Sequence, residues 1–289
     1  MTAAAAAFRE RTFRSHDGLE LAFRDYGPPD AGDVALLCLP GVTRTARDFE
    51  QLAPRHAGAR RVLCPDYRGR GRSQRAGRAD DYSVLAHVED VRHLLIVAGV
   101  HQVVALGTSF GGLLAMGLAA ALPGAVRGIM LNDVGPEFDQ RGLPGILDFI
   151  ARESSPANWD EAVALLKSAF PNLPARDAAG WQRIAELTWQ PDPDGRLRVE
   201  WDVRIVEPLL GDHPGDLWPM FRALRRLPVL AIRGERSDVL SAECFERMAR
   251  ELPALIRVTV PGVGHAPALD EPPAEAAIDQ FLAGFPAAH

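Results

Sequence analysis

The chain has 289 residues and a mass of 31.4 kDa, a length that fits one large α/β domain carrying an insertion. Hydrophobic residues make up 47% and charged residues 24%, which excludes disorder for the chain as a whole. The net charge of −6 argues against binding to nucleic acid or to an anionic membrane, and the arginines between residues 68 and 78 are expected to lie in a solvated loop.

Strand and helix patterns alternate along the first third of the chain. A turn at residues 16–18 separates two predicted antiparallel strands, 12–15 and 19–26. Continuous apolar runs, typical of strands buried on both faces, follow at 34–39, 61–64, 103–106 and 126–131. Helical spacing covers 83–97, with Ser83 as the N-cap, and a helix of small residues is predicted over 111–122.

The pattern changes after Asn132, and no buried-strand pattern occurs between residues 135 and 220. Helices are predicted there over 142–152, 159–169 and 176–189, followed by a turn-rich segment at 191–195 and a short extended run at 197–201. All five tryptophans lie in this part of the chain. We therefore predict a separate helical cap over residues 135–220.

The buried-strand pattern resumes at residues 228–233, and a helix (242–251), a strand (256–260) and a last helix (274–285) follow. Strands that alternate with helices predict right-handed crossovers and a mostly parallel sheet covered on both faces. The predicted fold is therefore a doubly wound α/β core, residues 1–134 and 221–289, with the cap inserted after the sixth strand.

The sequence gives no sign of a metal, a disulfide or a membrane anchor. Cys38, Cys64 and Cys244 are few and lack metal-ligand spacing, which suits a reducing compartment. The alanine-rich residues 1–7 lack the apolar region of a signal peptide, and no run of about 18 apolar residues occurs. We expect a cytoplasmic protein without metal, organic cofactor, nucleic-acid partner or membrane contact, and a homodimer is compatible with the sequence.

One short motif carries the strongest chemical signal. Ser109 lies in Gly107-Thr108-Ser109-Phe110-Gly111-Gly112, directly after a predicted strand and directly before a predicted helix. Small neighbours leave room for a strained turn that exposes the serine hydroxyl at the carboxyl end of the sheet. The N–H of Phe110 then lies at the start of a helix, where it can face an anion. A purely structural Gly-Ser turn is the alternative.

A nucleophilic serine needs a base, and the base needs an acceptor on its other nitrogen. His265 follows the last predicted strand, so its loop opens at the same edge of the parallel sheet as Ser109. Asp238 follows the strand 228–233 at that edge and is the preferred acceptor for His265. Glu235 in the same loop and Asp133 after the preceding core strand are its rivals.

The turn after strand 34–39 supplies a second donor for an oxyanion. Gly41 permits a tight turn there, and the N–H of Val42 can hold a substrate oxygen beside the N–H of Phe110. Arg44, or its neighbour Arg47, is a candidate for holding a substrate carboxylate with two hydrogen bonds, the alternative being a salt bridge or a solvated face.

Aromatic residues of the predicted cap are candidates for lining an acyl pocket. Trp159 and Trp181 are the ones we assign to substrate binding. The alternative is that the tryptophans form the apolar core of the cap itself.

The chain resembles the α/β-hydrolase fold family, in the branch of capped serine esterases and C–C hydrolases. The motifs that carry the resemblance are Leu39-Pro40-Gly41-Val42, the segment 66–73 (DYRGRGRS), 107–112 (GTSFGG), 234–238 (GERSD) and Gly264-His265. The resemblance implies Ser109 as nucleophile, Asp238 as the orienting acid, His265 as base, and Val42 with Phe110 as oxyanion donors. The family usually has His-Gly where this chain has Pro40-Gly41.

These residues predict a serine hydrolase that cleaves a carboxylic ester, a lactone or a related small acyl substrate through an acyl-enzyme. A serine at position 109, rather than an aspartate, argues against a haloalkane dehalogenase or an epoxide hydrolase. A C–C bond hydrolase acting on a β-diketone or ring-cleavage product, or an enol-lactonase, would use the same triad. A hydrolase-like ligand-binding protein with little turnover is a further alternative.

Overall fold

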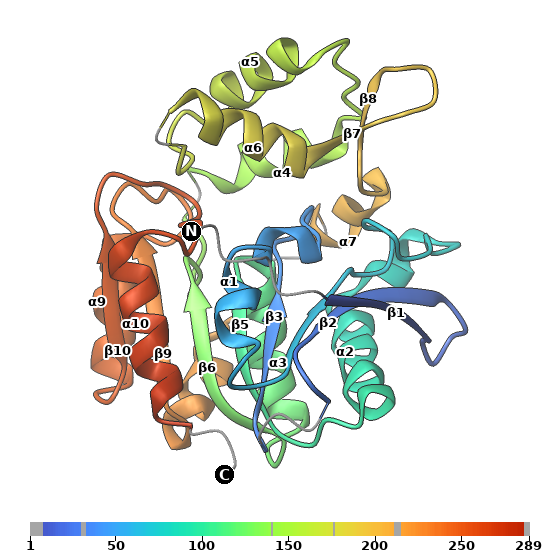
Figure 1. Cartoon of the computed structure of the whole chain (residues 1–289). Helices are drawn as coiled ribbons and strands as arrows, with labels where there is room; N and C mark the ends of the chain where they lie inside the picture. The colour runs from blue at the N-terminus through green and yellow to red at the C-terminus, as the bar shows by residue number, and fades with distance from the viewer. Residues whose placement is uncertain (1–7, 30–32, 140, 176, 211–214, 286–289) are drawn as a thin grey trace.

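An eight-stranded sheet forms the centre of the fold (Figure 1). Its strands are β1 (Phe8–Arg14), β2 (Glu20–Tyr26), β3 (Ala35–Leu39), β4 (Val62–Pro65), β5 (Val103–Thr108), β6 (Val126–Asn132), β9 (Val229–Gly234) and β10 (Ile256–Val260). The computed structural model describes residues 8–29, 33–139, 141–175, 177–210 and 215–285. The predicted absence of a signal peptide concerns residues 1–7, which lie outside these described residues.

The sheet is mostly parallel and has the strand order β1-β2-β4-β3-β5-β6-β9-β10. The hairpin β1–β2 and the pair β2–β4 are antiparallel, and the other neighbouring strands are parallel. The carboxyl ends of β5, β6, β9 and β10 therefore meet at one edge, in the part of the sheet where strand order and chain order agree.

Helices cover both faces of this sheet. They are α1 (Leu52–His56), α2 (Val84–Ala98), α3 (Phe110–Ala121), α8 (Trp218–Ala223), α9 (Ala242–Glu251) and α10 (Pro272–Ala283). Consecutive strand residues point to opposite faces. Leu37 and Ala105 accordingly pack with α2, α3, α8 and α9 in one buried cluster, whereas Leu36 and Val104 pack with α1 and α10 in another.

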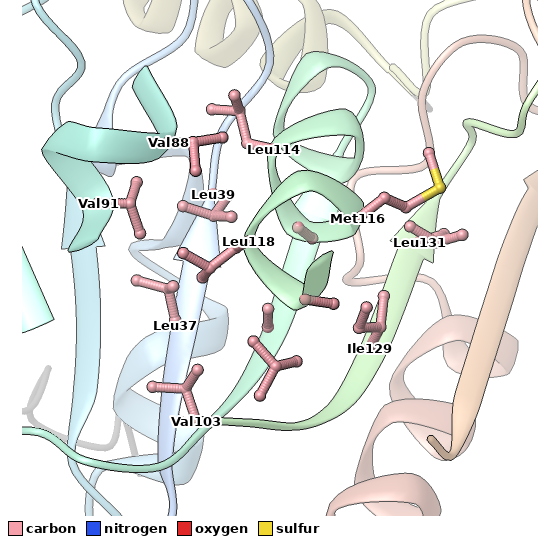
Figure 2. Packing of buried hydrophobic residues seen from close by; sticks show 14 of the residues in the cluster. Leu37, Leu39, Val88, Val91, Val103, Leu114, Met116, Leu118, Ile129 and Leu131 are labelled. Carbon is pink, nitrogen blue, oxygen red and sulfur yellow. The ribbon is translucent and has the colours of Figure 1, made fainter. Parts of the chain in front are cut away.

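Helix α3 is fixed tightly against the sheet. Figure 2 shows Leu114 of α3 beside Val88 of α2, and Leu118 of α3 near the sheet residues Leu39 and Leu37. At Gly112 a Cβ atom would come within 2.3 Å of a Val134 methyl group, so only glycine allows this approach. The N-terminal end of α3, and with it residue 109, is therefore held at a defined position.

The cap lies between β6 and β9 in the chain. It contains α4 (Leu143–Ala151), α5 (Trp159–Ala169), α6 (Ala178–Thr188), α7 (Glu207–Leu210) and the hairpin β7 (Trp189–Pro191) with β8 (Leu197–Val199). Figure 1 shows α4, α5 and α6 beyond the end of the sheet toward which the β6 arrow points. The α/β fold with a cap inserted after the sixth strand is thus confirmed.

The tryptophans divide between two apolar clusters. Trp189 and Trp201 are buried in the cluster that forms the interior of the cap, and Trp159 and Trp181 pack against the same cluster. Trp218 instead is buried in the core cluster together with residues of α3. The expectation that all five tryptophans belong to the cap therefore does not hold for Trp218.

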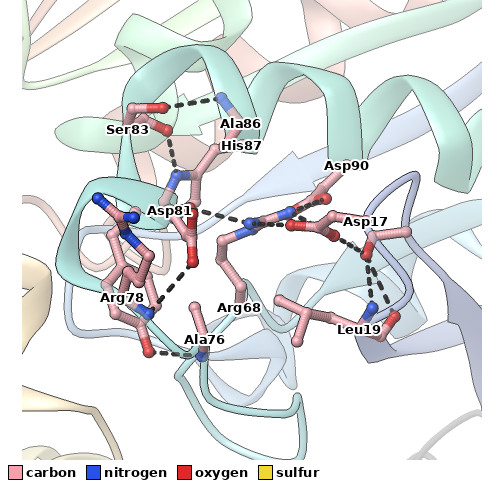
Figure 3. Close-up of polar contacts among 12 residues, drawn as sticks. Asp17, Leu19, Arg68, Ala76, Arg78, Asp81, Ser83, Ala86, His87 and Asp90 are labelled. Carbon is pink, nitrogen blue, oxygen red and sulfur yellow. Dashed lines mark hydrogen bonds and ion pairs between the residues drawn. The ribbon is translucent and has the colours of Figure 1, made fainter.

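The arginine-rich segment after β4 is buried at Arg68 and Arg70 and exposed, as expected, at Arg72, Arg75 and Arg78. Arg68 is fully buried and pairs with Asp90 at 2.6 Å and with Asp17 at 2.9 Å (Figure 3). Arg70 is also buried, and its guanidinium reaches His87. The sequence expectation of a solvated loop is wrong for these two arginines, because nearby carbonyl and carboxylate oxygens offset the cost of burying them.

Candidate active site

Ser109 lies in a strained turn between β5 and α3. Its φ of 52° and ψ of −117° fall in a region that residues with a Cβ rarely adopt. A Cβ at Gly107 would come within 2.2 Å of the Gly111 carbonyl oxygen, and a Cβ at Gly111 within 2.1 Å of the Leu39 carbonyl oxygen. The flanking glycines are therefore required for the turn, as the motif predicts.

His265 reaches this serine from the loop after β10. Its Nε2 atom lies 3.0 Å from the Ser109 hydroxyl oxygen. The loop is held on both sides, since the N–H of Gly264 donates to the Asn172 carbonyl of the cap at 2.7 Å and the N–H of Gly262 donates to the Glu235 carboxylate at 2.8 Å. Glu235, a rival for the acid position, thus supports the histidine loop without touching the imidazole.

The carboxylate at the other nitrogen of His265 belongs to Asp133. The distance from Nδ1 to the Asp133 Oδ2 atom is 2.8 Å, and the aspartate is fully buried directly after β6. The N–H of Gly234 donates to Oδ1 at 2.8 Å, and the hydroxyl of Ser237 donates to Oδ2 at 2.6 Å. The prediction that Asp238 contacts His265 is therefore wrong in this structure, and the rival Asp133 takes that position.

The distance along the chain from each strand end explains the error. Asp133 is the residue immediately after β6, and its own N–H still donates to the Ile232 carbonyl of β9. Asp238 lies four residues beyond the end of β9, where its carbonyl oxygen accepts from the N–H of Gly142. A side chain directly at the strand end stays at the catalytic edge, whereas the turn carries Asp238 away from the imidazole.

The surrounding donors define the proton positions at His265. The two donors from Gly234 and Ser237 require Asp133 to be an acceptor at both oxygens, so the Nδ1 atom of His265 carries the hydrogen that points to Asp133. The Nε2 atom is then free to accept the Ser109 proton. This is the tautomer that a general base for a serine nucleophile needs.

Hydrogen bonds also hold the turn after β3 that carries Gly41 and Val42. The hydroxyl of Tyr67 donates to the Pro40 carbonyl at 3.1 Å, and the Nε of Arg70 donates to the Val42 carbonyl at 2.7 Å. Burial lowers the pKa of Arg70 to about 10, so the guanidinium stays charged at neutral pH. These side chains fix the turn at the place where the family usually has histidine.

The N–H groups of Val42 and Phe110 have no hydrogen-bond acceptor among the described residues. Phe110 is the first residue of α3, so its N–H is one of the donors that a helix leaves without an internal partner. Both groups are therefore available to a ligand beside Ser109.

A cavity of about 340 Å³ opens over Ser109 and His265 between the core and the cap. Gly41, Val42 and Arg44 contribute to its lining, whereas Trp159 and Trp181 do not. The assignment of these two tryptophans to substrate binding is therefore wrong, and the alternative that they pack on the interior of the cap agrees with the structure. The apolar lining comes instead from α4, α5, α6 and the segment after α5: Ile146, Phe149, Ile150, Leu166, Phe170, Leu173, Ile184 and Leu187.

Arg44 is already occupied by protein groups. Its guanidinium holds the Asp48 carboxylate through contacts of 2.8 to 3.1 Å and donates to the Thr188 hydroxyl at 2.9 Å. Arg47 pairs with Glu200 at 2.8 Å and likewise has a structural partner. The salt-bridge alternative that the sequence left open for this pair is the one that the structure supports.

Away from the cavity, His16, Asp17 and Asp90 lie close enough together to hold a metal ion. Both carboxylates are hydrogen-bonded to Arg68 (Figure 3), which supplies a positive charge to them from within the protein. This cluster is therefore explained as an ion-pair network in which Arg68 and Asp90 are buried and Asp17 is exposed.

Comparison with known proteins agrees with the fold. The model of the alpha/beta hydrolase family matches residues 36–279. The chain is 33% identical over 275 residues to a 3-hydroxybutyrate-oligomer hydrolase of Cupriavidus necator, covering 91% of this chain and 93% of that protein. It is 29% identical to a 2-(acetamidomethylene)succinate hydrolase of Mesorhizobium japonicum, covering 80% of this chain and 81% of the relative.

Among solved structures, an alpha/beta hydrolase from Novosphingobium aromaticivorans is 42% identical, with a TM-score of 0.91 over 97% of this chain and 99% of that one. The chain therefore belongs to the alpha/beta hydrolase family and is a hydrolytic enzyme. Within the described ranges, none of its helices combines the length and apolar character needed to cross a bilayer.

Proposed function

We propose that the protein hydrolyses a carboxylic ester through an acyl-enzyme, with Ser109 as nucleophile, His265 as base and Asp133 as the orienting acid. The observation that carries the proposal is the continuous chain of hydrogen bonds from the Ser109 hydroxyl to the His265 imidazole (3.0 Å) and on to the Asp133 carboxylate (2.8 Å). An aspartate in this position stabilises the imidazolium that forms when the serine loses its proton.

The reaction proceeds in two halves. Ser109 attacks the ester carbonyl while Nε2 of His265 takes the hydroxyl proton, and the N–H groups of Val42 and Phe110 stabilise the oxyanion. The tetrahedral intermediate collapses, the C–O bond breaks, and His265 gives its proton to the departing alcohol. Water then attacks the acyl-enzyme, with His265 again taking and returning the proton, which releases the acid and free Ser109.

The substrate class we favour is a short ester of hydroxyalkanoate units. Two observations support it: the similarity to a 3-hydroxybutyrate-oligomer hydrolase along nearly the whole chain, and a cavity of about 340 Å³ with a largely aliphatic and aromatic lining. Cavities of this size bind small molecules. The same triad and oxyanion donors can act on the carbonyl of an ester or of a β-diketone. The two reactions therefore have to be distinguished by comparing turnover of the two kinds of substrate.

The experiment compares wild type with Ser109→Ala on 4-nitrophenyl butyrate, a 3-hydroxybutyrate dimer and a dienoic ring-cleavage product. We expect wild type to hydrolyse the esters and to be labelled by a fluorophosphonate, and Ser109→Ala to lose both properties. Ser168→Ala, an exposed serine on α5 outside the cavity, is the matched control and should behave as wild type.

Other results would change the assignment in defined ways. Faster turnover of the ring-cleavage product than of every ester would replace the ester assignment with C–C hydrolysis by the same triad. An unlabelled wild type that turns over no ester or lactone would favour a ligand-binding protein.

A further inference from the structure

Helix α6 turns one face toward the cavity. The cavity-lining residues of this helix are Gly180, Arg183, Ile184, Leu187 and Thr188, at spacings of three and four that place them on one side of an α-helix. The half-buried Gln182 donates to the exposed Glu186 on another side of the helix. Arg183 is therefore a charged residue on the face of α6 that is otherwise apolar or small.

The guanidinium of Arg183 has no direct partner in the part of the chain that the structure describes. Among the described residues, no acidic group lies within 4.0 Å of its guanidinium and no acceptor forms a hydrogen bond with it. Asp238 also lines the cavity and forms no ion pair with Arg183. Arg44, the other arginine of the cavity, differs because Asp48 neutralises it.

An arginine in this setting is suited to an anionic ligand. Its planar guanidinium offers five N–H donors in a fixed geometry that matches the two oxygens of a carboxylate. Charge-assisted pairs of this kind are stronger where water is partly excluded, and the half-buried Arg183 stands beside Ile184 and Leu187. The five N–H donors of Arg183 are half-buried without a protein partner, which does not stabilise the fold. A bound carboxylate would accept hydrogen bonds from them.

We propose that Arg183 binds a free carboxylate of the substrate, so that the enzyme prefers esters that carry an acid group over neutral esters. This inference rests on the proposed ester hydrolysis. One end of the substrate is held by the guanidinium on the cap while the ester carbonyl lies at Ser109 on the core. Because the contact is made in the bound substrate and in the transition state alike, Arg183 acts mainly on KM.

The test uses mono-4-nitrophenyl glutarate and its methyl ester, which differ only in the free carboxylate. We expect Arg183→Gln to lower kcat/KM for the acid by about 10- to 100-fold, mostly through KM, as for loss of a hydrogen-bonded charge. The methyl ester should change by less than about threefold. Arg183→Lys should recover part of the loss because it keeps the charge and loses the planar fork.

Arg152→Gln is the matched control, because Arg152 is an exposed arginine of the cap that does not line the cavity. It should leave the preference for the acid unchanged. Thermal melting of each variant reports folding independently of activity. Equal losses on the acid and the methyl ester, or no loss on either, would overturn the role of Arg183.

A binding measurement separates this inference from the proposed reaction. Calorimetry with glutarate on wild type, Arg183→Gln and Arg183→Lys needs no turnover. Binding that weakens in Arg183→Gln supports the carboxylate site even if wild type hydrolyses none of the esters tested. Unchanged glutarate binding in Arg183→Gln, or inorganic phosphate that binds more tightly than glutarate, refutes the site even if ester hydrolysis is demonstrated.

Discussion

Replacing Asp133 by asparagine tests the assignment of the acid most directly. The Gly234 N–H faces Oδ1 and can only donate, so the new amide oxygen will occupy that position and the NH₂ group will face His265 and Ser237. The Nδ1 atom of His265 must then accept, which moves its hydrogen to Nε2, where it faces the Ser109 hydroxyl. The base is thereby held in the wrong tautomer.

The loss follows from that tautomer. We expect kcat/KM to fall on the order of 10³- to 10⁴-fold, which corresponds to about 4 to 5.5 kcal/mol of transition-state stabilisation. Asp238→Asn makes the same chemical change on an aspartate that lines the cavity without contacting His265, and it should stay within about tenfold of wild type.

Initial rates on 4-nitrophenyl butyrate and the rate of fluorophosphonate labelling measure both variants, with circular dichroism as the check on folding. A loss for Asp238→Asn as large as that for Asp133→Asn would refute the reasoning. So would an Asp133→Asn enzyme that keeps a tenth of the wild-type rate.

Two further predictions concern stability. Gly111→Ala would bring a Cβ within 2.1 Å of the Leu39 carbonyl oxygen and should destabilise the fold by about 3 kcal/mol or more. Gly145→Ala on α4 is the control, because its Cβ would meet open space, and it should raise the melting temperature slightly. Equal melting temperatures for the two variants would contradict the close approach at Gly111. Burial and the charge of Arg70 hold the pKa of His87 well below 6.5, so the unfolded chain binds more protons than the folded one as the pH falls below that value. The unfolding free energy should therefore fall as the pH is lowered from 7.5 to 5.5, by on the order of 1 kcal/mol through this group. In urea titrations His87→Gln should remove that part of the fall, and an unchanged pH dependence in this variant would contradict the prediction.

The fold and the position of the proposed nucleophile were predictable because their signals are local. The runs that form β3, β5 and β6 are apolar on both faces, which is typical of strands buried in a parallel sheet. The glycines that allow the turn at Ser109 are close to it in the chain. His265 could be selected because it follows the last strand of a parallel sheet, and the carboxyl ends of such strands share one edge.

The identity of the proposed acid and the lining of the cavity required the three-dimensional structure. Asp133 and Asp238 both follow core strands, and only the structure shows that Gly234 and Ser237 complete the shell around Asp133. The tryptophans are large apolar residues that suit a substrate pocket or a cap interior equally well, and sequence spacing does not distinguish the two. Arg183 lies in a predicted helix, and the sequence does not show which face of that helix lines the cavity. Only the position of the cap relative to the core shows it.

The cap is joined to the same loops that carry the reacting groups. Its hydrogen bonds to the core include Gly264 N–H to the Asn172 carbonyl, Arg44 to the Thr188 hydroxyl and Gly71 N–H to the Glu200 carbonyl. The first of these holds the loop of His265, and the second holds the segment that follows the oxyanion turn. A change in cap packing will therefore reach the proposed base and oxyanion donors as well as the substrate, so cap substitutions that alter substrate preference should also alter kcat. Arg183 is the useful exception, because its side chain has no bond to the described core and can be changed without loosening either loop.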